Sequence, residues 1–373
     1  MQIPFHKTHT GIKEKKAVLE ALDSGWLTMG PKTVEFENKF KEYTGSKYAI
    51  SVNSATAAMH LALKAIGLKE NDEVILPTNT FVATAEVVTY FNAKPVICDV
   101  EFDTHNIDVN KIEQLITSKT KAIIPVHFAG QPCDMDEINE IASKFNLKVI
   151  EDAAHTLPTS YKGKKIGTLS DITCFSFYAT KTLSTGEGGM ATTDNEAYAQ
   201  IMKINRLHGI SKDAWDRYTA KGNWYYEVVD NGHKYNTTDI NAALGIVQLS
   251  KIDNLYKKRK SIAQRYITAF SNKENIVLPF IKDDRTTSWH LFVIKVNNRD
   301  ELSSKLSENG IGNSVHFIPI HKQPYYKNNY GYKDRDYPVA NSVYEKSLSL
   351  PIYPDMTDEE VDYVIKNVFK YAK

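Results

Sequence analysis

Between residues 45 and 195, short apolar segments alternate with segments of helical composition, and this alternation constrains the fold more than any other feature of the sequence. The apolar segments predict strands at residues 48–52, 73–76, 95–100, 121–127, 147–151, 173–177 and 189–193. The segments between them predict helices at residues 55–66, 80–90, 109–116 and 134–145. Apolar strands separated by helices form mostly parallel sheets that are covered on both faces. We therefore expect an α/β fold.

The rest of the chain predicts longer helices and a second, smaller unit. Residues 196–207 and 239–270 have helical composition, and residues 210–235 between them are aromatic-rich and irregular. The C-terminal part predicts strands at residues 289–296 and 313–317, helices at residues 301–308 and 357–371, and a loop over residues 319–337. We expect a large α/β domain over residues 1–250 and a small α+β domain over residues 251–373.

The composition excludes several classes of protein. Lys and Arg number 46 and Asp and Glu number 45, so the net charge is +1 and gives no general attraction to nucleic acid or to an anionic membrane. No apolar stretch is long enough to span a membrane, and the first residues lack the apolar run of a signal peptide, which predicts a cytoplasmic protein. Cys98, Cys133 and Cys174 are widely spaced and predict neither a disulfide framework nor a metal site.

The segment Asn53-Ser54-Ala55-Thr56 joins a predicted strand to a predicted helix. The first N–H groups of a helix point outward at the positive end of its dipole, and this arrangement suits a phosphate group. Taken alone, the segment is more typical of an ordinary N-cap at Ser54.

A second polar segment, Glu151-Asp152-Ala153-Ala154-His155, directly follows an apolar strand. Ligands of open α/β sheets bind beyond the carboxyl ends of the strands, so Asp152 is placed to face a ligand. The alternative is a carboxylate that caps the next segment. His155 taken alone is more typical of a structural histidine.

A third segment leads from a predicted strand through Ser176 to Lys181 and then to the glycines of residues 186–189. A lysine in a packed cleft can lose its proton and attack a carbonyl carbon. The commoner interpretation of a loop lysine is an exposed side chain. The glycines lack the spacing of a G-x-G-x-x-G phosphate loop and indicate close approach of the backbone near Lys181.

Together, the three segments predict a specific cofactor site. The carboxyl ends of parallel strands meet at one edge of a sheet, where a phosphate site, Asp152 and Lys181 would lie close together. Pyridoxal 5′-phosphate (PLP) needs this set: a lysine that binds it covalently, an Asp that pairs with the ring nitrogen, and a phosphate cup. The sequence therefore predicts a PLP enzyme.

With these motifs in view, the chain resembles the DegT/StrS-type nucleotide-sugar aminotransferases, which have the aspartate-aminotransferase fold (fold type I). The motifs that carry the resemblance run in order over nearly the whole chain: residues 24–31 (SGWLTMGP), 53–56 (NSAT), 151–155 (EDAAH), 175–181 (FSFYATK), 186–189 (GEGG), 206–209 (RLHG), 232–236 (GHKYN), 289–292 (WHLF) and 316–321 (HFIPIH). The resemblance implies a large, mostly parallel sheet domain and a smaller C-terminal α+β domain.

The resemblance also implies a role for particular residues. Lys181 would hold the cofactor and move the proton, Asp152 would pair with the ring nitrogen, and His155 would lie beside the ring hydroxyl. Further cofactor contacts are implied for Phe81, stacked on the ring, for Ala55, Thr56 and Ser176, at the phosphate, and for Asn236, which would reach the phosphate of the neighbouring subunit in a homodimer with shared sites. Substrate contacts are implied for Trp26, Met29, His316, Tyr325 and Tyr326. The site would contain no metal.

The implied reaction transfers an amino group from L-glutamate to the 4-keto carbon of a nucleotide-diphosphate sugar, which gives a 4-amino sugar for a surface polysaccharide or lipopolysaccharide. Within the family, residues 213–217 and 233–236 are most similar to the enzymes that form UDP-4-amino-4-deoxy-L-arabinose. The I-P-I-H sequence at residues 318–321 departs from those enzymes, so a dTDP-4-keto-6-deoxyhexose is an alternative substrate. A non-catalytic PLP-binding regulator is a second alternative, and the presence of Lys181 argues against it.

Overall fold

The structure is a computed structural model that describes residues 1–211 and 225–373. Within these ranges the largest sheet has seven strands in the order β1-β9-β8-β5-β4-β2-β3. The strands are β1 (Tyr48–Val52), β2 (Glu73–Pro77), β3 (Lys94–Cys98), β4 (Thr120–Ile123), β5 (Lys148–Asp152), β8 (Ile172–Ser176) and β9 (Gly189–Thr193). The strands from β8 to β3 pair in parallel, whereas β9 is antiparallel to β1 and β8. The expected α/β fold with a mostly parallel sheet is confirmed.

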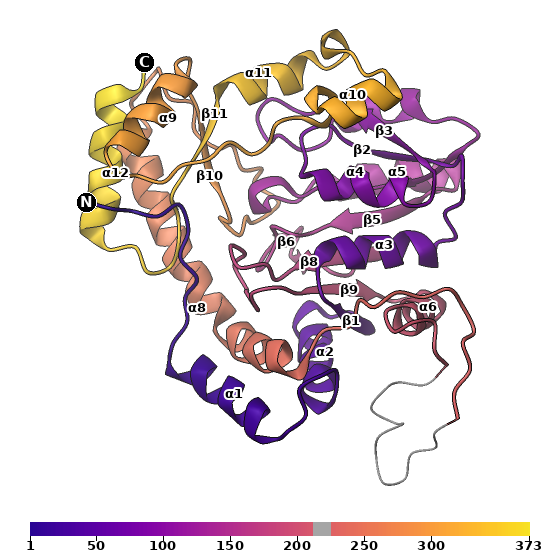
Figure 1. The fold of residues 1–373 in the computed structure, drawn as a ribbon. Coiled ribbons are helices and arrows are strands. Elements are labelled where there is room, and N and C mark those ends of the chain that lie inside the picture. The colour runs from indigo at the N-terminus through magenta and orange to yellow at the C-terminus, as the bar shows by residue number, and fades with distance from the viewer. Residues whose placement is uncertain (212–224) are drawn as a thin grey trace.

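Helices cover both faces of this sheet (Figure 1). One face packs against α3 (Ala55–Ala65), α4 (Val82–Thr89) and α6 (Glu196–Asn205), and the other against α2 (Pro31–Thr44), α5 (Met135–Phe145) and the first half of α8 (Asp239–Phe270). Successive side chains of a strand point to opposite faces. Accordingly, Ile50 and Val52 of β1 pack in the first layer and Ala49 packs in the second.

A smaller unit follows at the C-terminal end. It contains the antiparallel strands β10 (Phe292–Lys295) and β11 (Ser347–Leu350), with α9 (Arg299–Glu308), α12 (Asp358–Tyr371) and the second half of α8 packed around them. The helix α8 has 32 residues and carries side chains of both cores, Leu249 and Ile252 in one and Tyr266 and Phe270 in the other. The domain boundary at residue 250 therefore falls inside a continuous helix, and the division into two domains stays a prediction.

The first residues of the chain run along the smaller unit toward the edge of the large sheet (Figure 1). Ile3 forms a parallel bridge with Ile311 and is buried in the core of the smaller unit. Further along, the Thr8 hydroxyl donates to the Ala179 carbonyl at 2.7 Å. This N-terminal segment, residues 3–9, therefore lies between the smaller unit and the loop that carries Lys181.

Several elements differ from the sequence predictions. Residues 109–116 form two short 3₁₀ turns, η1 (Val109–Lys111) and η2 (Glu113–Leu115), rather than one helix. Residues 313–317 contribute only an isolated bridge between Ser314 and Ser349. The predicted loop at residues 319–337 contains η4 (Ile320–Lys322), α10 (Pro324–Tyr330) and η5 (Asp334–Asp336).

The elements that we did not predict are α1 (Ile12–Asp23), α2, the hairpin β6 (Ser160–Tyr161) and β7 (Lys164–Lys165), η3 (Phe128–Gly130), α11 (Pro338–Lys346) and β11. The helices α2, α10 and α11 begin with proline, which suits the first turn of a helix as well as it suits a loop. In the described part of the chain, no helix has the length and apolar character needed to cross a membrane.

Candidate active site

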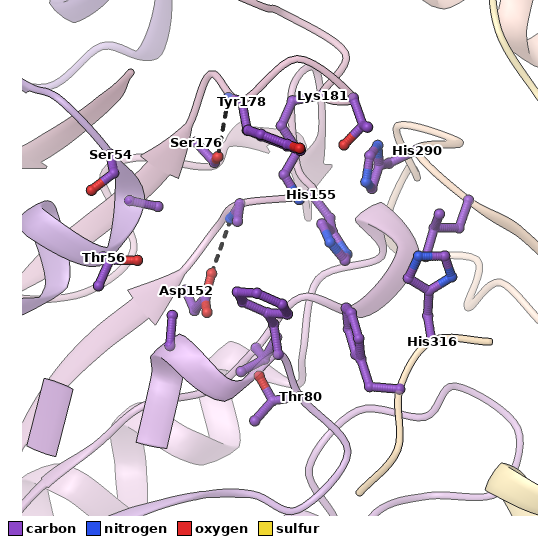
Figure 2. Close-up of a pocket in the computed structure, with 18 of the residues that line it drawn as sticks. Ser54, Thr56, Thr80, Asp152, His155, Ser176, Tyr178, Lys181, His290 and His316 are labelled. Carbon is purple, nitrogen blue, oxygen red and sulfur yellow. Dashed lines mark hydrogen bonds between the residues drawn. The ribbon is translucent and has the colours of Figure 1, made fainter. Parts of the chain in front are cut away.

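A cavity of about 600 Å³ lies at the carboxyl ends of β5 and β8, beside the start of α3 (Figure 2). Eight of the predicted site residues line it: Ala55, Thr56, Phe81, Asp152, His155, Ser176, Lys181 and His316. Figure 2 shows Ser54 and Thr56 on one side of this cavity and His155, His290 and His316 on the other. The volume is within the range typical of small-molecule sites.

The start of α3 has the N-cap that the sequence favoured and leaves the phosphate interpretation open. The Ser54 hydroxyl caps the helix by accepting a hydrogen bond from the Ala57 amide at 3.0 Å. The amides of Ala55 and Thr56 belong to the first turn, where a helix offers no internal partner, and both residues line the cavity. At Gly189, a Cβ would lie 2.4 Å from the backbone carbon of Ser54, so glycine is required for this close approach. Gly189 therefore lets the start of β9 pack directly against the start of α3.

Two adjacent carboxylates at the end of β5 point to opposite faces of the sheet and have different surroundings. Glu151 is fully buried away from the cavity, where it accepts hydrogen bonds from the Ser170 and Thr173 hydroxyls and from His127 Nε2. Asp152 lines the cavity, is 5% exposed, and has two neutral donors, the Thr84 hydroxyl at 2.8 Å and the Ala154 amide at 3.1 Å. Burial raises the pKa of Asp152, so a cation in the cavity would stabilise its charged form.

Lys181 enters the cavity from the loop after β8. This loop folds back on itself, since the Lys181 amide donates to the Tyr178 carbonyl and Tyr178 forms a bridge with Gly186. Desolvation lowers the pKa of Lys181 to about 8, and attraction to the Asp152 carboxylate acts in the opposite direction. A lysine with this pKa exchanges a proton readily near neutral pH, as both nucleophilic attack and proton transfer require.

Four histidines line the cavity, His6, His155, His290 and His316, and Figure 2 shows the last three on the side opposite Ser54 and Thr56. Burial lowers the pKa of each, to about 4 for His6 and His316 and well below the usual value for His155 and His290, with the Lys181 charge adding to the effect. The rings of His155 and His290 lie 4.3 Å apart, and the Nδ1 atom of each has no hydrogen-bond partner among the described residues. At neutral pH these side chains are uncharged and retain nitrogens that can bind a ligand.

The other five predicted site residues lie elsewhere in this chain. Trp26 donates to the Met29 carbonyl, and Met29 is buried against Leu207. Tyr326 is buried in the core on the α3 side of the sheet, and Tyr325 lines a separate surface hollow. Asn236 Nδ2 donates to the carbonyl of Thr237. Their roles in binding stay predictions.

The structure also brings residues to the cavity to which we had assigned no role. These are Phe5, His6, Thr80, Tyr178, His290 and Phe317, among others. His290 lies in the WHLF motif at residues 289–292, which carried part of the resemblance, so a sequence signal existed for it. Phe5 and His6 had no such signal, because they reach the cavity only through the long-range packing of the N-terminal segment.

These features fit PLP. A phosphate group fits the start of α3, where a Cβ at Gly189 would clash with the backbone of Ser54 and Ala55. The buried Asp152 carboxylate suits a protonated ring nitrogen. Lys181 lies in the same cavity with a lowered pKa. No three His, Cys, Asp or Glu side chains within the described ranges are grouped so as to hold a metal ion. Fold and site together define a PLP-dependent aminotransferase.

Comparisons with known proteins give the family. Residues 9–369 match the DegT/DnrJ/EryC1/StrS aminotransferase family, and the chain belongs to it. It is 51% identical to the uncharacterized protein MJ1066 of Methanocaldococcus jannaschii over 99% of this chain and 97% of that protein. It is 48% identical to the spore coat polysaccharide biosynthesis protein SpsC of Bacillus subtilis, over 100% of this chain and 97% of SpsC.

A solved structure supports the same assignment. Spr1654 of Streptococcus pneumoniae, assigned as a sugar aminotransferase, superimposes with a TM-score of 0.92 at 35% identity, over 98% of each chain for its PMP form. It has also been solved in a PLP form. The predicted fold type, the enzyme class of sugar aminotransferase and the cofactor PLP are therefore confirmed.

Proposed function

We propose that this aminotransferase moves the amino group of L-glutamate to the 4-keto carbon of a UDP-4-keto sugar, which yields 2-oxoglutarate and a UDP-4-amino sugar for a surface polysaccharide. The observation that carries the proposal is the convergence of Lys181, Asp152 and the start of α3 in one cavity, within a family of sugar aminotransferases. The sugar would be a 4-keto pentose or a 4-keto-6-deoxyhexose. The similarity to SpsC supports a product for polysaccharide synthesis.

The residues of the cavity divide the work between binding and proton transfer. PLP, when bound, supplies a carbonyl carbon for the amino group and a ring that accepts electrons. The start of α3 binds the phosphate dianion through its amides and its dipole. Asp152 stabilises positive charge at the ring nitrogen, and Lys181 takes up and returns a proton at Nζ because its pKa is close to neutral. Phe5, Phe81 and Phe317 give the cavity an apolar rim that limits access of water.

The experiment that tests the reaction is an amino-transfer assay with L-glutamate and a panel of UDP- and dTDP-linked 4-keto sugars, read out as 2-oxoglutarate. We expect turnover with a UDP-4-keto sugar. Activity on free 2-oxo acids alone would reject the nucleotide-sugar substrate. A clear preference for dTDP-4-keto-6-deoxyhexose would replace the uridine part of the proposal by its alternative, which the I-P-I-H sequence at residues 318–321 favours. Residues 213–217, which support the pentose, lie outside the described residues.

We also propose that the protein is a cytoplasmic homodimer with shared sites. Asn236 lies outside the cavity of its own chain, as expected of a residue that reaches the phosphate of its partner. Exposed apolar side chains shortly before Asn236 in the sequence suit an interface: Tyr225, Tyr226, Val228 and Val229.

Mixing two inactive variants tests the shared site. Lys181→Ala and Asn236→Ala subunits, once exchanged into heterodimers, should recover part of the wild-type activity, because one site of each heterodimer then has both residues intact. Proven subunit exchange without recovery would place Asn236 in the site of its own chain or outside the site.

A further inference from the structure

The N-terminal segment holds one histidine in the wall of the cavity by contacts on both sides. Upstream, Ile3 is fixed to the smaller unit by hydrogen bonds to Gly310 and from Gly312, both 2.8 Å long. Downstream, the Thr8 hydroxyl bonds to the carbonyl of Ala179, two residues before Lys181. His6, between these anchors, lines the cavity. Its place therefore follows from the packing of the whole segment.

The neighbouring ring supports this placement. Phe5 stacks on His316 with the ring centroids 5.6 Å apart and also packs in an apolar cluster with Phe128 and Leu291. His316 is in turn held through Nδ1 by the Ser349 hydroxyl at 2.8 Å. The backbone beside His6 is thus fixed against residues of both units, so the imidazole occupies a defined position.

The imidazole of His6 is neutral and presents one free nitrogen. Burial, the Arg259 guanidinium and the Lys181 amine lower its pKa to about 4, while a hydrogen bond to the Ala179 backbone acts in the opposite direction. Nε2 is buried and has no partner among the described residues. The Ala179 contact raises the pKa, so a ring N–H serves that contact, and Nε2, which has no partner among the described residues, is assigned as the nitrogen that carries the lone pair.

Arg259 maintains this state from behind the wall. The guanidinium is buried on α8 and donates to the carbonyl of Ile352 at 2.7 Å and to that of Trp289 at 3.3 Å. Both of these acceptors are neutral carbonyls, so the charge of Arg259 continues to act on His6 and His290. A second positive charge on either ring is therefore unfavourable.

The chemistry of the two substrates decides which of them a neutral acceptor recognises. Apart from the amino group that reacts, L-glutamate offers only two carboxylates, which accept hydrogen bonds and do not donate them. A sugar ring offers hydroxyl groups, which donate. A buried acceptor left without a donor costs free energy, so a site built this way favours the ligand that supplies one.

We propose that His6 binds the sugar substrate by accepting, at Nε2, a hydrogen bond from one of its hydroxyl groups, and that it thereby contributes to sugar selectivity. The inference rests on the proposed amination of a nucleotide sugar. It assigns a role to the N-terminal segment, which brings His6 to the cavity that Lys181 also lines.

The test separates the two half-reactions of the PLP-loaded enzyme. His6→Phe keeps an aromatic ring without a nitrogen, and His6→Gln keeps a side-chain acceptor. For His6→Phe we expect kcat/KM for the sugar nucleotide to fall about tenfold, mainly through KM. The glutamate half-reaction, followed by the change in the cofactor spectrum without any sugar, should stay within about twofold. His6→Gln should recover most of the loss.

Two controls make the result specific. His9→Phe makes the same change in the same segment, at a histidine that bonds to Asp355 and does not line the cavity, and it should leave both half-reactions unchanged. With the wild type, a sugar nucleotide that lacks the contacted hydroxyl should show the same fall in kcat/KM that His6→Phe causes. With His6→Phe, removing that hydroxyl should cause no further fall.

Three outcomes would overturn the inference. Equal losses in both half-reactions of His6→Phe would mean a structural role. Unchanged sugar kinetics in an active enzyme would reject the contact alone and leave the proposed function intact. A wild-type enzyme that reacts with L-glutamate but with no nucleotide sugar would reject the proposed function, and the role of His6 with it.

Discussion

Two walls of the cavity differ in how they use charge. The cofactor wall, made of residues 54–56, Asp152, Ser176 and Lys181, holds a helix dipole, a carboxylate and an amine. The histidine wall, made of His6, His155, His290 and His316, presents four imidazoles that burial keeps neutral. In the proposed function, the charged groups lie where a proton would move or a phosphate would bind, and the neutral nitrogens line the rest of the cavity. A neutral wall can recognise hydroxyl groups without competing for the amine or the phosphate.

Replacing the amine of the cofactor wall should have the largest effect. Lys181→Ala removes the group that moves the proton, so kcat should fall on the order of 10³-fold or more. Borohydride should trap the cofactor of the wild type on the peptide that contains Lys181. The surface variant Lys144→Ala should keep full activity, since Lys144 pairs with Glu113 at the surface. Trapping of the cofactor on another lysine would contradict the assignment of Lys181 to the cofactor.

The two carboxylates of β5 should separate chemistry from stability. Asp152→Asn should fold normally and lose about 100-fold or more in kcat, because an amide supplies no charge to the ring nitrogen. Glu151→Gln should instead lower the free energy of unfolding by about 2–4 kcal/mol, since it disturbs three buried hydrogen bonds. Urea unfolding and steady-state kinetics on both variants measure the two effects. Near-normal turnover of Asp152→Asn would place the partner of the ring nitrogen elsewhere.

The cofactor-free protein should show the cost of burying Lys181. The pKa of this lysine is about 8 in the folded chain and 10.5 when the amine is fully solvated, so the unfolded chain binds more protons between these values and stability rises with pH there. Below pH 8 the penalty is fully present. Lys181→Met should therefore be more stable than the wild type by about 1–3 kcal/mol at pH 7, and the difference should vanish toward pH 10.5. Lys144→Met serves as the control, and a difference independent of pH would contradict the desolvated amine.

The smallest effect should come from a tyrosine outside both walls. Tyr325 is 56% exposed in a separate hollow of its own chain, so Tyr325→Ala should change kcat/KM for the sugar nucleotide by less than about twofold unless the partner's cavity includes it. This position was predicted to bind substrate. A large rise in KM on Tyr325→Ala would indicate that Tyr325 reaches the cavity of the partner subunit and forms a further part of its lining.

The two walls also differ in what the sequence could predict. Asp152 and Ser176 end apolar strands, Lys181 lies in the loop after β8, and the start of α3 follows β1, so the rule that strand ends meet at one edge placed them together. Local sequence was also enough to find the N-cap at Ser54. The residues of the cofactor wall could therefore be predicted from the positions of the strand ends.

The histidine wall depends on contacts between distant segments. His6, His290 and His316 come from three segments outside the large sheet, and no spacing in the sequence relates them. Proline at the start of α2, α10 and α11 likewise suits a helix or a loop, and only the burial of side chains such as Tyr326 decides between them. Tertiary packing carries this information.

The bridge between Ile3 and Ile311 has a consequence for how the protein is made. Ribosomes release the chain from its N-terminus, and the large sheet can pair as soon as β9 has emerged. The N-terminal segment must wait, because its partners Gly310, Ile311 and Gly312 are synthesised much later. Closing so long a loop slows the step that joins them. A nascent chain can therefore form α3, the proposed phosphate site, before His6 reaches the cavity, so that capture of the cofactor would precede competence for the proposed sugar.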